Sequence, residues 1–272
     1  MKKETRRVMR AIIITTLLAT ATVMPTYAAT DSLVNSAFSV LRGIVESQRD
    51  LNPEQENKLG RAAAVRIIGK RSLATDKSLY HVTLLVQALA KITDAPPTLT
   101  GYHSAVIADD YSLNAFALPG GYILITQGLY DLCEGDELLA VLAHELAHLN
   151  LKHGVNSIKN AKLTATLTSA TATTLSTTEL AKLFSESAAS LTDTLVVKGY
   201  SRSTELEADA EAFKMLRLIG VSPMAFDSIL RKIGQSTTKN DATGGFFSTH
   251  PSTDDRRKNL DQLLASIEPT QQ

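Results

Sequence analysis

The segment that most constrains the fold is residues 136–154, DELLAVLAHELAHLNLKHG, in which His144, Glu145 and His148 lie in an apolar run. Apolar residues occupy most positions of this run, so it predicts a buried helix. Residues four apart share one face of a helix, so both imidazoles can bind one metal ion. Glu145 lies about 100° further around the helix and can address a water on that ion. A helix with two solvated histidines is the alternative, but burial makes His and Glu without partners costly.

Two residues are candidates for a third metal ligand. His153 points about 140° away from His148 if the helix continues, which predicts a cap at the helix C-terminus instead. Glu205 and Asp209 are four apart on a second predicted helix and share a face, whereas Glu207 points away. We therefore expect Glu205 to be the third ligand and Asp209 to orient a ligand histidine. Taken alone, these two carboxylates would instead indicate an acidic, solvated helix face.

The N-terminus predicts a cleavable secretory signal over residues 1–28. Five basic residues precede the mostly apolar stretch 11–24, and Thr26 and Ala28 place small residues before the expected cleavage point. The stretch is short for a membrane span of roughly 20 residues, although an uncleaved anchor is the alternative. Cleavage would remove five basic residues and one acidic residue from 28 of each, which leaves a mildly acidic protein. The sequence thus predicts a periplasmic protein with no stable transmembrane segment.

The composition excludes some classes of protein. Cys133 is the only cysteine, so no disulfide can form within the chain. Lys and Arg together number 28, as do Asp and Glu, and Trp is absent, so nothing favours a nucleic-acid partner.

Hydrophobic periodicity predicts one α+β domain over residues 29–272 in which helices dominate. A small antiparallel sheet over about 102–126 is expected beside the helix of His144, and Asp136 is its predicted N-cap. The Ala/Ser/Thr-rich segment 155–198 predicts a helical hairpin or a flap. The remaining predicted helices lie in the N-terminal part 29–95, from Asn52-Pro53 to Ile68 and over 78–92, and in the C-terminal part, over 202–219, 223–233 and 254–267.

The order of these motifs resembles a known family. H-E-x-x-H followed by S-R-x-x-E-x-E-A-D at 201–209 resembles the HtpX-like and CAAX-prenyl-protease-like gluzincin peptidases. The segments 114–131 and 247–256, the latter with its Ser-Thr-His-Pro sequence, are similar to further parts of that family. The resemblance covers about 110–260. It implies a zincin-like metallopeptidase domain with one Zn²⁺ per chain, and it agrees with Glu205 as the third ligand.

The zinc chemistry expected for such a site assigns a role to each residue. His144, His148 and Glu205 would leave one zinc position open for water. Glu145 would take a proton from that water and later return one to the leaving amine. His250 is a candidate oxyanion donor, or an occasional fourth ligand that closes the site, and a surface histidine without a role is the alternative. Arg256 is expected to anchor the same loop or to pair with Asp209 or a nearby carboxylate, unless it is simply solvated.

Substrate binding is expected along an edge strand, where an extended peptide can add as another strand. Residues 121–126 are the best match, with Gly121, Tyr122 and Ile123 in contact with the peptide and Asn114 and Phe116 lining the same cleft. The alternative is that 121–126 is a core strand.

Together these features predict a zinc-dependent endopeptidase that hydrolyses unfolded or misassembled cell-envelope proteins, with peripheral association to the outer membrane or its assembly machinery. One alternative is a periplasmic chaperone or assembly factor on the same fold. Another is a latent protease that is inhibited by its own segment 155–198 or by His250.

Overall fold

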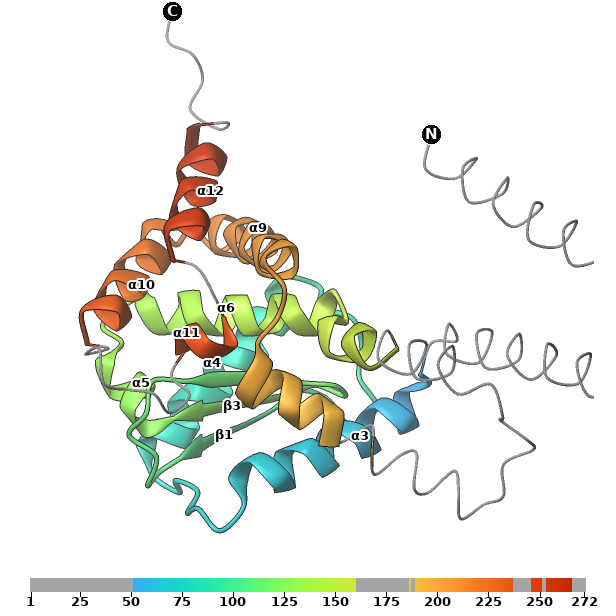
Figure 1. The fold of residues 1–272 in the computed structure, drawn as a ribbon. Coiled ribbons are helices and arrows are strands. Elements are labelled where there is room, and N and C mark those ends of the chain that lie inside the picture. The colour runs from blue at the N-terminus through green and yellow to red at the C-terminus, as the bar shows by residue number, and fades with distance from the viewer. Residues whose placement is uncertain (1–50, 160–185, 187–188, 237–245, 251–252, 266–272) are drawn as a thin grey trace, which may run out of the picture.

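A three-stranded sheet lies between helices in the computed structural model (Figure 1). The structure describes residues 51–159, 186, 189–236, 246–250 and 253–265. The predicted signal over 1–28, the helical prediction for 29–50 and most of the segment 155–198 lie outside the described residues. Within the described part of the chain, no helix is both long and apolar enough to cross a membrane.

The sheet is mixed. Strands β1 (His103–Ile107), β2 (Ala115–Leu118) and β3 (Tyr122–Thr126) are arranged in the order β1-β3-β2. β3 runs antiparallel to β2 but parallel to β1. The prediction of an antiparallel sheet is therefore wrong for the β1–β3 pair. The reason is that β1 and β2 do not pair, although they are neighbours in sequence, and the hairpin from β2 brings β3 between them.

The β2–β3 hairpin turn depends on two glycines. Gly120 and Gly121 have φ angles of 78° and 93°, a region that L side chains rarely adopt. A Cβ at Gly120 would also lie 2.6 Å from the Cα of Asn57 in the neighbouring helix. The turn therefore needs glycine both for its backbone conformation and for its close approach to that helix.

Helices cover both faces of the sheet. Leu124 of β3 packs in one apolar cluster with Leu59 of α3 (Pro53–Ile68). Ile123 and Ile125 point to the opposite face, in a cluster with residues of α4 (Lys77–Ile92) and α6 (Glu137–Asn150). A strand that is buried on both faces is apolar at nearly every position, which explains why residues 121–126 show little alternation.

The sequence predicts an N-cap residue for α3 and for α6, and the structure confirms the capping hydrogen bond only for α3. Asn52 caps α3 as expected, because its Oδ1 accepts from the Gln55 backbone N–H while its own N–H donates to Gln55 Oε1. Asp136 directly precedes α6, but it makes no capping hydrogen bond with its side chain. The next residue, Glu137, instead accepts a hydrogen bond from the Glu134 backbone N–H.

Helices α9 (Arg202–Leu218), α10 (Met224–Ser236) and α12 (Thr253–Ala265) lie on the side of α6 that faces away from the sheet (Figure 1). α9 packs along α6, while α10 contacts α6 and α12 contacts α9. The predicted helices agree with these elements to within a few residues over the described part of the chain. The remaining named elements are α5 (Gln127–Leu132), the π-helical turn η2 (Thr194–Lys198) and the short helix α11 (Phe246–Thr249).

Candidate active site

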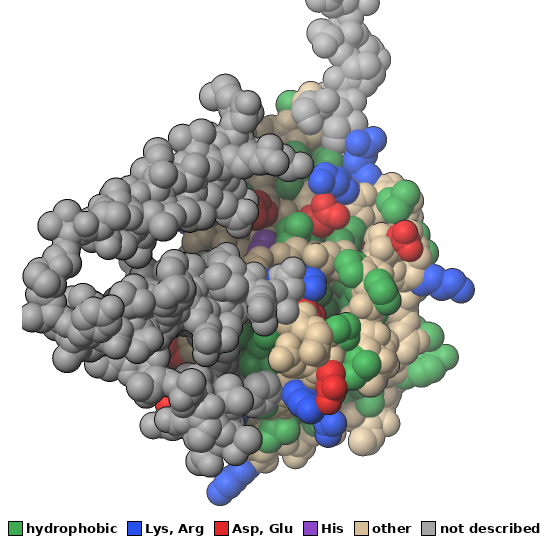
Figure 2. Space-filling view, turned by 90° about the vertical axis from the view of Figure 1, so that its right-hand side faces the viewer, with side chains coloured by type: hydrophobic (Ala, Val, Ile, Leu, Met, Phe, Trp, Pro, Cys, Tyr) green, Lys and Arg blue, Asp and Glu red, His purple; other side chains and the backbone are tan. Residues whose placement is uncertain are grey.

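The two histidines of α6 converge on one point. His144 and His148 lie one helical turn apart, and their Nε2 atoms are 3.1 Å from each other. Both side chains and Glu145 are buried, with at most 1% of each residue exposed. Space-filling Figure 2 shows a histidine side chain within a recess of the surface, next to an acidic side chain. The interpretation of α6 as a buried helix rather than a solvated one agrees with this structure.

Helix α9 brings Glu205 to the same point. Its two carboxylate oxygens lie 3.4 Å from His144 Nε2 and 3.4 Å from His148 Nε2. Glu205 and Asp209 are both fully buried on the face of α9 that meets α6. The alternative of an acidic, solvated helix face is therefore wrong. Glu207 points outward and is 68% exposed at its side chain, as the helical spacing predicts.

His250 completes a group of four potential ligands. It directly follows α11, and its Nδ1 lies 3.4 Å from His144 Nε2 and 3.1 Å from Glu205 Oε1. One ligand atom from each of His144, His148, Glu205 and His250 lies within 4.8 Å of the others. The alternative of a surface histidine does not hold, because His250 is 3% exposed.

The spacing of these atoms fits a zinc ion. Zinc binds nitrogen and oxygen at about 2.0–2.2 Å in tetrahedral geometry, which places neighbouring ligand atoms about 3.3–3.5 Å apart. The separations between 3.1 and 3.4 Å in this group are close to those values. Two or three imidazoles with one carboxylate also suit zinc better than they suit a hard cation such as Mg²⁺. The residues present therefore fit the metal that the sequence predicts.

A second set of contacts holds His144 from behind. Its Nδ1 lies 3.0 Å from Asp209 Oδ1, in line with the expectation that Asp209 orients a ligand histidine. Asp209 in turn accepts two hydrogen bonds from Arg256 of α12, at 2.8 Å from Nε and 2.7 Å from Nη2. Arg256 is 1% exposed, so it pairs with Asp209 rather than being solvated.

The electrostatics of the group favour ionised Glu205. Burial raises its pKa, but the charges of His250 and Arg256 outweigh burial and hold the pKa well below its usual value. Burial and the charge of Arg256 lower the pKa of His144, yet its hydrogen bonds to Asp209 and Glu205 prevail and raise the pKa to about 9. Burial lowers the pKa of His148 to about 3. The site thus holds at least one carboxylate and one neutral imidazole ready to bind a cation.

Glu145 lies beside this group without belonging to it. Its Oε1 is buried and makes no hydrogen bond to any described residue, and His250 Nε2 is 3.6 Å away. A buried carboxylate oxygen without a partner is rare in folded proteins and is typical of functional sites. Burial raises the pKa of Glu145, which suits a group that must exchange protons near neutrality.

The predicted peptide-binding strand is in the wrong place. β3 contains Tyr122 and Ile123 and is the central strand, paired on both sides, so no peptide can add to it. The alternative that 121–126 is a core strand is correct. Phe116 lies instead on β2, which is an edge strand, and Asn114 directly precedes that strand. Asn114 Oδ1 accepts a hydrogen bond from Thr249, the residue before His250.

Two residues beside the potential metal ligands have contacts that the sequence did not predict. Tyr200 stacks on His148, with 4.5 Å between the ring centroids. His153 does not serve as a cap, because its Nδ1 lies 2.9 Å from His148 Nδ1. The structural reason is that α6 ends at Asn150 and the chain turns, so the helical angle used in the prediction does not apply. The S-R-x-x-E motif that follows Tyr200 is a sequence signal that could have drawn attention to that tyrosine.

These features define the class of the protein. A zincin-like metalloendopeptidase has two histidines one turn apart on a buried helix, with a glutamate directly after the first of them. A carboxylate from a second helix and a small mixed sheet complete this framework, and all of these features are present here. The sequence profile described as "Peptidase family M48" matches residues 79–264. The chain belongs to this family of metallopeptidases, and the resemblance inferred from its motifs is confirmed at that level.

Curated relatives carry consistent names. The chain is 25% identical over 227 residues to "Metalloprotease LoiP" of Escherichia coli K12, a match that covers 79% of this chain and 83% of the relative. It is 27% identical to "Mitochondrial metalloendopeptidase OMA1" of Schizosaccharomyces pombe, over 79% of this chain and 63% of the relative. It is 26% identical to the "Beta-barrel assembly-enhancing protease" of Escherichia coli K12, over 72% of this chain but only 41% of that protein.

Proposed function

We propose that this metalloendopeptidase uses one zinc ion, held by His144, His148 and Glu205, to hydrolyse peptide bonds of unfolded or misassembled cell-envelope proteins. The observation that carries the proposal is the convergence of the three ligand residues at separations of 3.1–3.4 Å beside a buried carboxylate, Glu145, that has no hydrogen bond at Oε1 within the described structure.

Each residue of the site has its own role in peptide hydrolysis. When bound, zinc would polarise the substrate carbonyl and lower the pKa of a water molecule. Glu145 takes the proton of the attacking water and later donates a proton to the leaving amine, a role that its raised pKa favours. Asp209 fixes the ring of His144, and Arg256 fixes Asp209.

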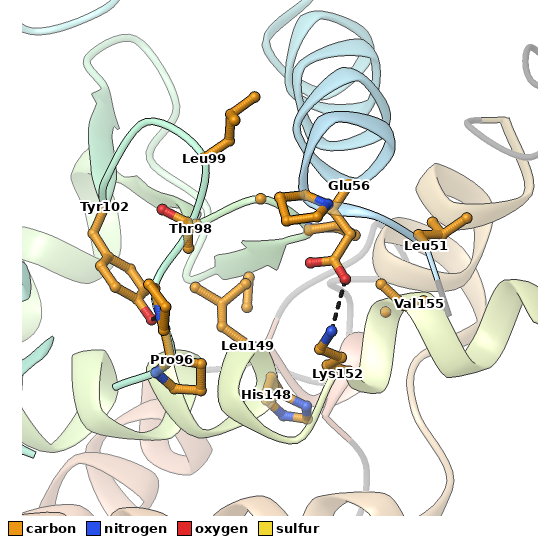
Figure 3. A pocket seen from close by; sticks show the side chains of 17 residues that line it. Leu51, Glu56, Pro96, Thr98, Leu99, Tyr102, His148, Leu149, Lys152 and Val155 are labelled. Atoms are coloured by element: carbon orange, nitrogen blue, oxygen red, sulfur yellow. Dashed lines mark hydrogen bonds and ion pairs between the residues drawn. The ribbon is translucent and has the colours of Figure 1, made fainter. Parts of the chain in front are cut away.

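Substrate would bind along β2, which is paired with a strand on one side only but whose residues are at most 6% exposed. The outward backbone groups of Ala117 have no strand partner in the described structure, so a peptide that adds to β2 would pair with them once its approach is open. Ala117 also lines a cavity of about 100 Å³ that reaches His148. Figure 3 shows His148 at the foot of this cavity, near the ion pair between Lys152 and Glu56. Pairing of this kind requires an extended chain, which favours unfolded substrates over folded ones.

The cellular setting of the proposal rests on the relatives and on the N-terminal sequence. A beta-barrel assembly-enhancing protease is among the relatives, and the signal predicted over 1–28 would direct the chain to the periplasm. We therefore place the protein in the periplasm, acting on envelope proteins and in peripheral association with the outer membrane or its assembly machinery.

The test uses residues 29–272, purified and loaded with zinc, and an unfolded substrate such as casein. Wild type should contain one zinc per chain and cleave casein. Glu145→Gln keeps the shape of the side chain but cannot act as a base, so it should keep its zinc and lose about 10³-fold in kcat/KM. A chain that binds no zinc, or a Glu145→Gln variant that cleaves as fast as wild type, would contradict the proposal.

The position of His250 favours a latent form of the same enzyme. A catalytic zinc site keeps one position open, whereas four protein ligands close it. His250 Nδ1 lies 3.4 Å from His144 Nε2, the separation expected of a fourth ligand. In this form His250 would block the open position, and its withdrawal would activate the protease.

Replacing His250 distinguishes its two candidate roles. If it closes the site, His250→Ala should raise casein turnover several-fold at unchanged zinc content. If it is an oxyanion donor, the same variant should lose about 10²-fold in kcat. If wild type and His250→Ala both bind zinc but neither cleaves casein, the result would favour a chaperone or assembly factor over a protease.

A further inference from the structure

His153 lies behind His148, on the side opposite the proposed zinc ligands. The two Nδ1 atoms are 2.9 Å apart, which is hydrogen-bonding distance. On its other side, His153 Nε2 lies 3.5 Å from Glu207 Oε2, a contact between polar groups that is longer than a hydrogen bond. His153 is 6% exposed, whereas the side chain of Glu207 is 68% exposed at the surface of α9. Contacts thus lead from buried His148 through His153 to Glu207 at the surface.

A tight turn brings His153 into this position. α6 ends at Asn150, and Lys152 adopts a positive φ of 55°, which few residues other than glycine adopt readily. The turn redirects the chain, so the imidazole of His153 returns toward His148 instead of pointing away. Lys152 itself points outward, and its Nζ lies 2.9 Å from Glu56 Oε1. A strained turn at this point is a cost that the contact between His153 and His148 would help to offset.

Chemistry determines which nitrogen carries the hydrogen. If His148 binds zinc through Nε2, its remaining hydrogen is on Nδ1 and must be donated. The acceptor 2.9 Å away is then the unprotonated Nδ1 of His153. If neutral, His153 must consequently carry its own hydrogen on Nε2, which lies 3.5 Å from the exposed carboxylate of Glu207. Only His153 with this tautomer accepts from His148, and its Nε2 is buried and makes no hydrogen bond within the described structure.

The ring of His148 needs this contact in addition to its stacking. Tyr200 stacks on it with an interplanar angle of 16°, which fixes the plane of the ring. Stacking does not distinguish the ring from the same ring turned over by 180°, in which carbon atoms would replace both nitrogens. A hydrogen bond at Nδ1 does distinguish them, because only one of the two orientations can donate to His153. The two contacts together leave Nε2 one direction, toward Glu205 and His144.

We propose that His153 is a positioning residue that fixes the tautomer and the orientation of His148 for zinc. This inference rests on the proposed zinc site. It makes the two histidine ligands unequal, because His144 is held by the carboxylate of Asp209 and His148 by a neutral imidazole. Partners of ligand histidines generally contribute 10–100-fold to metal affinity.

Zinc affinity is the readout, measured by competition with a chelating dye on residues 29–272. His153→Phe keeps a ring but removes the acceptor, and it should weaken zinc binding by about 10–100-fold. His153→Asn places an oxygen near the position of Nδ1, and it should restore the affinity to within a few-fold of wild type. His81→Phe, the same change at an exposed histidine of α4, is the matched control and should bind zinc as wild type does.

The outcomes separate this inference from the proposed function. Wild type without zinc would contradict the proposed function itself. Wild type with zinc and a folded His153→Phe of equal affinity would overturn the positioning role alone. A purely structural role would lower the melting temperature of His153→Phe and His153→Asn alike and would show no rescue of affinity by Asn.

A second measurement does not depend on any variant being folded. Long-range ¹H–¹⁵N correlation of zinc-loaded wild type should place the ring hydrogen of His148 on Nδ1 and that of His153 on Nε2. A ring hydrogen on Nδ1 of His153 would overturn the inference, because that nitrogen could no longer accept from His148.

Discussion

At the scale of single residues, the most unusual feature is Arg256, a cation that is almost fully buried. Its guanidinium donates two hydrogen bonds to Asp209, its Nη1 lies 3.2 Å from Glu205 Oε2, and its carbon Cζ lies 5.1 Å from the centre of the Phe226 ring. A charge in this environment is stable only because it is paired with carboxylates. Arg256 thus connects helix α12 to the carboxylates on which the site depends.

Removing this charge should destabilise the fold strongly. Arg256→Met leaves Asp209 buried without its main partner, so we expect a loss of about 3 kcal/mol in the free energy of unfolding. Arg256→Lys keeps the charge but loses the forked pair of hydrogen bonds, and it should cost less. Urea unfolding at equal zinc content measures both. Wild-type stability in Arg256→Met would show that the pair contributes nothing.

The site residues were predicted to very different degrees from the sequence. The spacing of His144, Glu145 and His148 is a local property of one helix, so it could be read directly. Glu205 needed a second helix whose partner helical spacing alone cannot identify. His153 was misjudged because its position depends on the φ angle of Lys152, a backbone feature that no side-chain pattern specified.

At the scale of elements, Glu137 anchors the start of α6 to α10. Its carboxylate accepts hydrogen bonds from the Glu134 backbone N–H, from Ser228 Oγ at 2.6 Å and from Lys232 Nζ at 2.8 Å. Burial raises its pKa, but these hydrogen bonds outweigh burial and lower the pKa below its usual value. The ionised form is therefore the one that stabilises the fold.

The contribution of Glu137 should depend on pH in a defined direction. A lowered folded-state pKa means that the stabilisation is complete above the unfolded-state value of about 4.3 and is lost as pH falls through the folded-state value. Glu137→Gln should therefore cost about 1–2 kcal/mol at pH 7, and the difference from wild type should shrink below about pH 4. Urea unfolding from pH 7 to pH 4 and below tests this.

The control for this prediction is Glu211→Gln. Glu211 contacts Lys214 on an exposed helix surface, so the variant should differ little from wild type at any pH. A Glu137→Gln variant that is as stable as wild type at pH 7 would show that the anchor is unimportant.

The glycine turn between β2 and β3 offers a second prediction at this scale. Gly120→Ala adds a Cβ 2.6 Å from Asn57 Cα at a φ of 78°, so it should cost about 3 kcal/mol. Gly135→Ala is a matched control, because Gly135 has a φ of 55° with no atom within 4 Å of the added Cβ, and it should cost about 1 kcal/mol. Equal losses in the two variants, measured by urea unfolding, would mean that the close approach of the turn to α3 contributes nothing.

The elements themselves were easier to predict than their pairing. Periodicity and capping residues located α3, α4, α9 and α12, because helices depend on local sequence. The order β1-β3-β2 was not accessible, because it depends on which strand the hairpin places beside β1. The burial of β3 on both faces removed the alternation that would have distinguished it from an edge strand.

At the scale of the whole molecule, the site joins parts that are distant in sequence. His144 lies on α6, Glu205 on α9 and His250 after α11, so three separate segments meet at one proposed ion. An ion held by segments that separate on unfolding stabilises the folded state by mass action. The single domain over residues 29–272 stays a prediction from the sequence.

Zinc removal should therefore lower the melting temperature. Free zinc at 1,000 times its dissociation constant adds about 4 kcal/mol to the stability of the folded state. For a chain of this length that corresponds to a shift on the order of 10 °C. Thermal unfolding before and after treatment with a chelator measures it, and His148→Ala, which lacks a proposed ligand, should show a much smaller shift. An unchanged melting temperature in wild type would contradict a structural contribution of the ion.

The most direct test of the account is the position of the metal itself. Crystals of residues 29–272 grown with zinc should give one anomalous diffraction peak at the zinc absorption edge. The account predicts that this peak lies within bonding distance of Nε2 of His144, Nε2 of His148 and a carboxylate oxygen of Glu205. A peak that is absent, or that lies elsewhere in the molecule, would contradict the assignment of these ligands and the proposed mechanism with it.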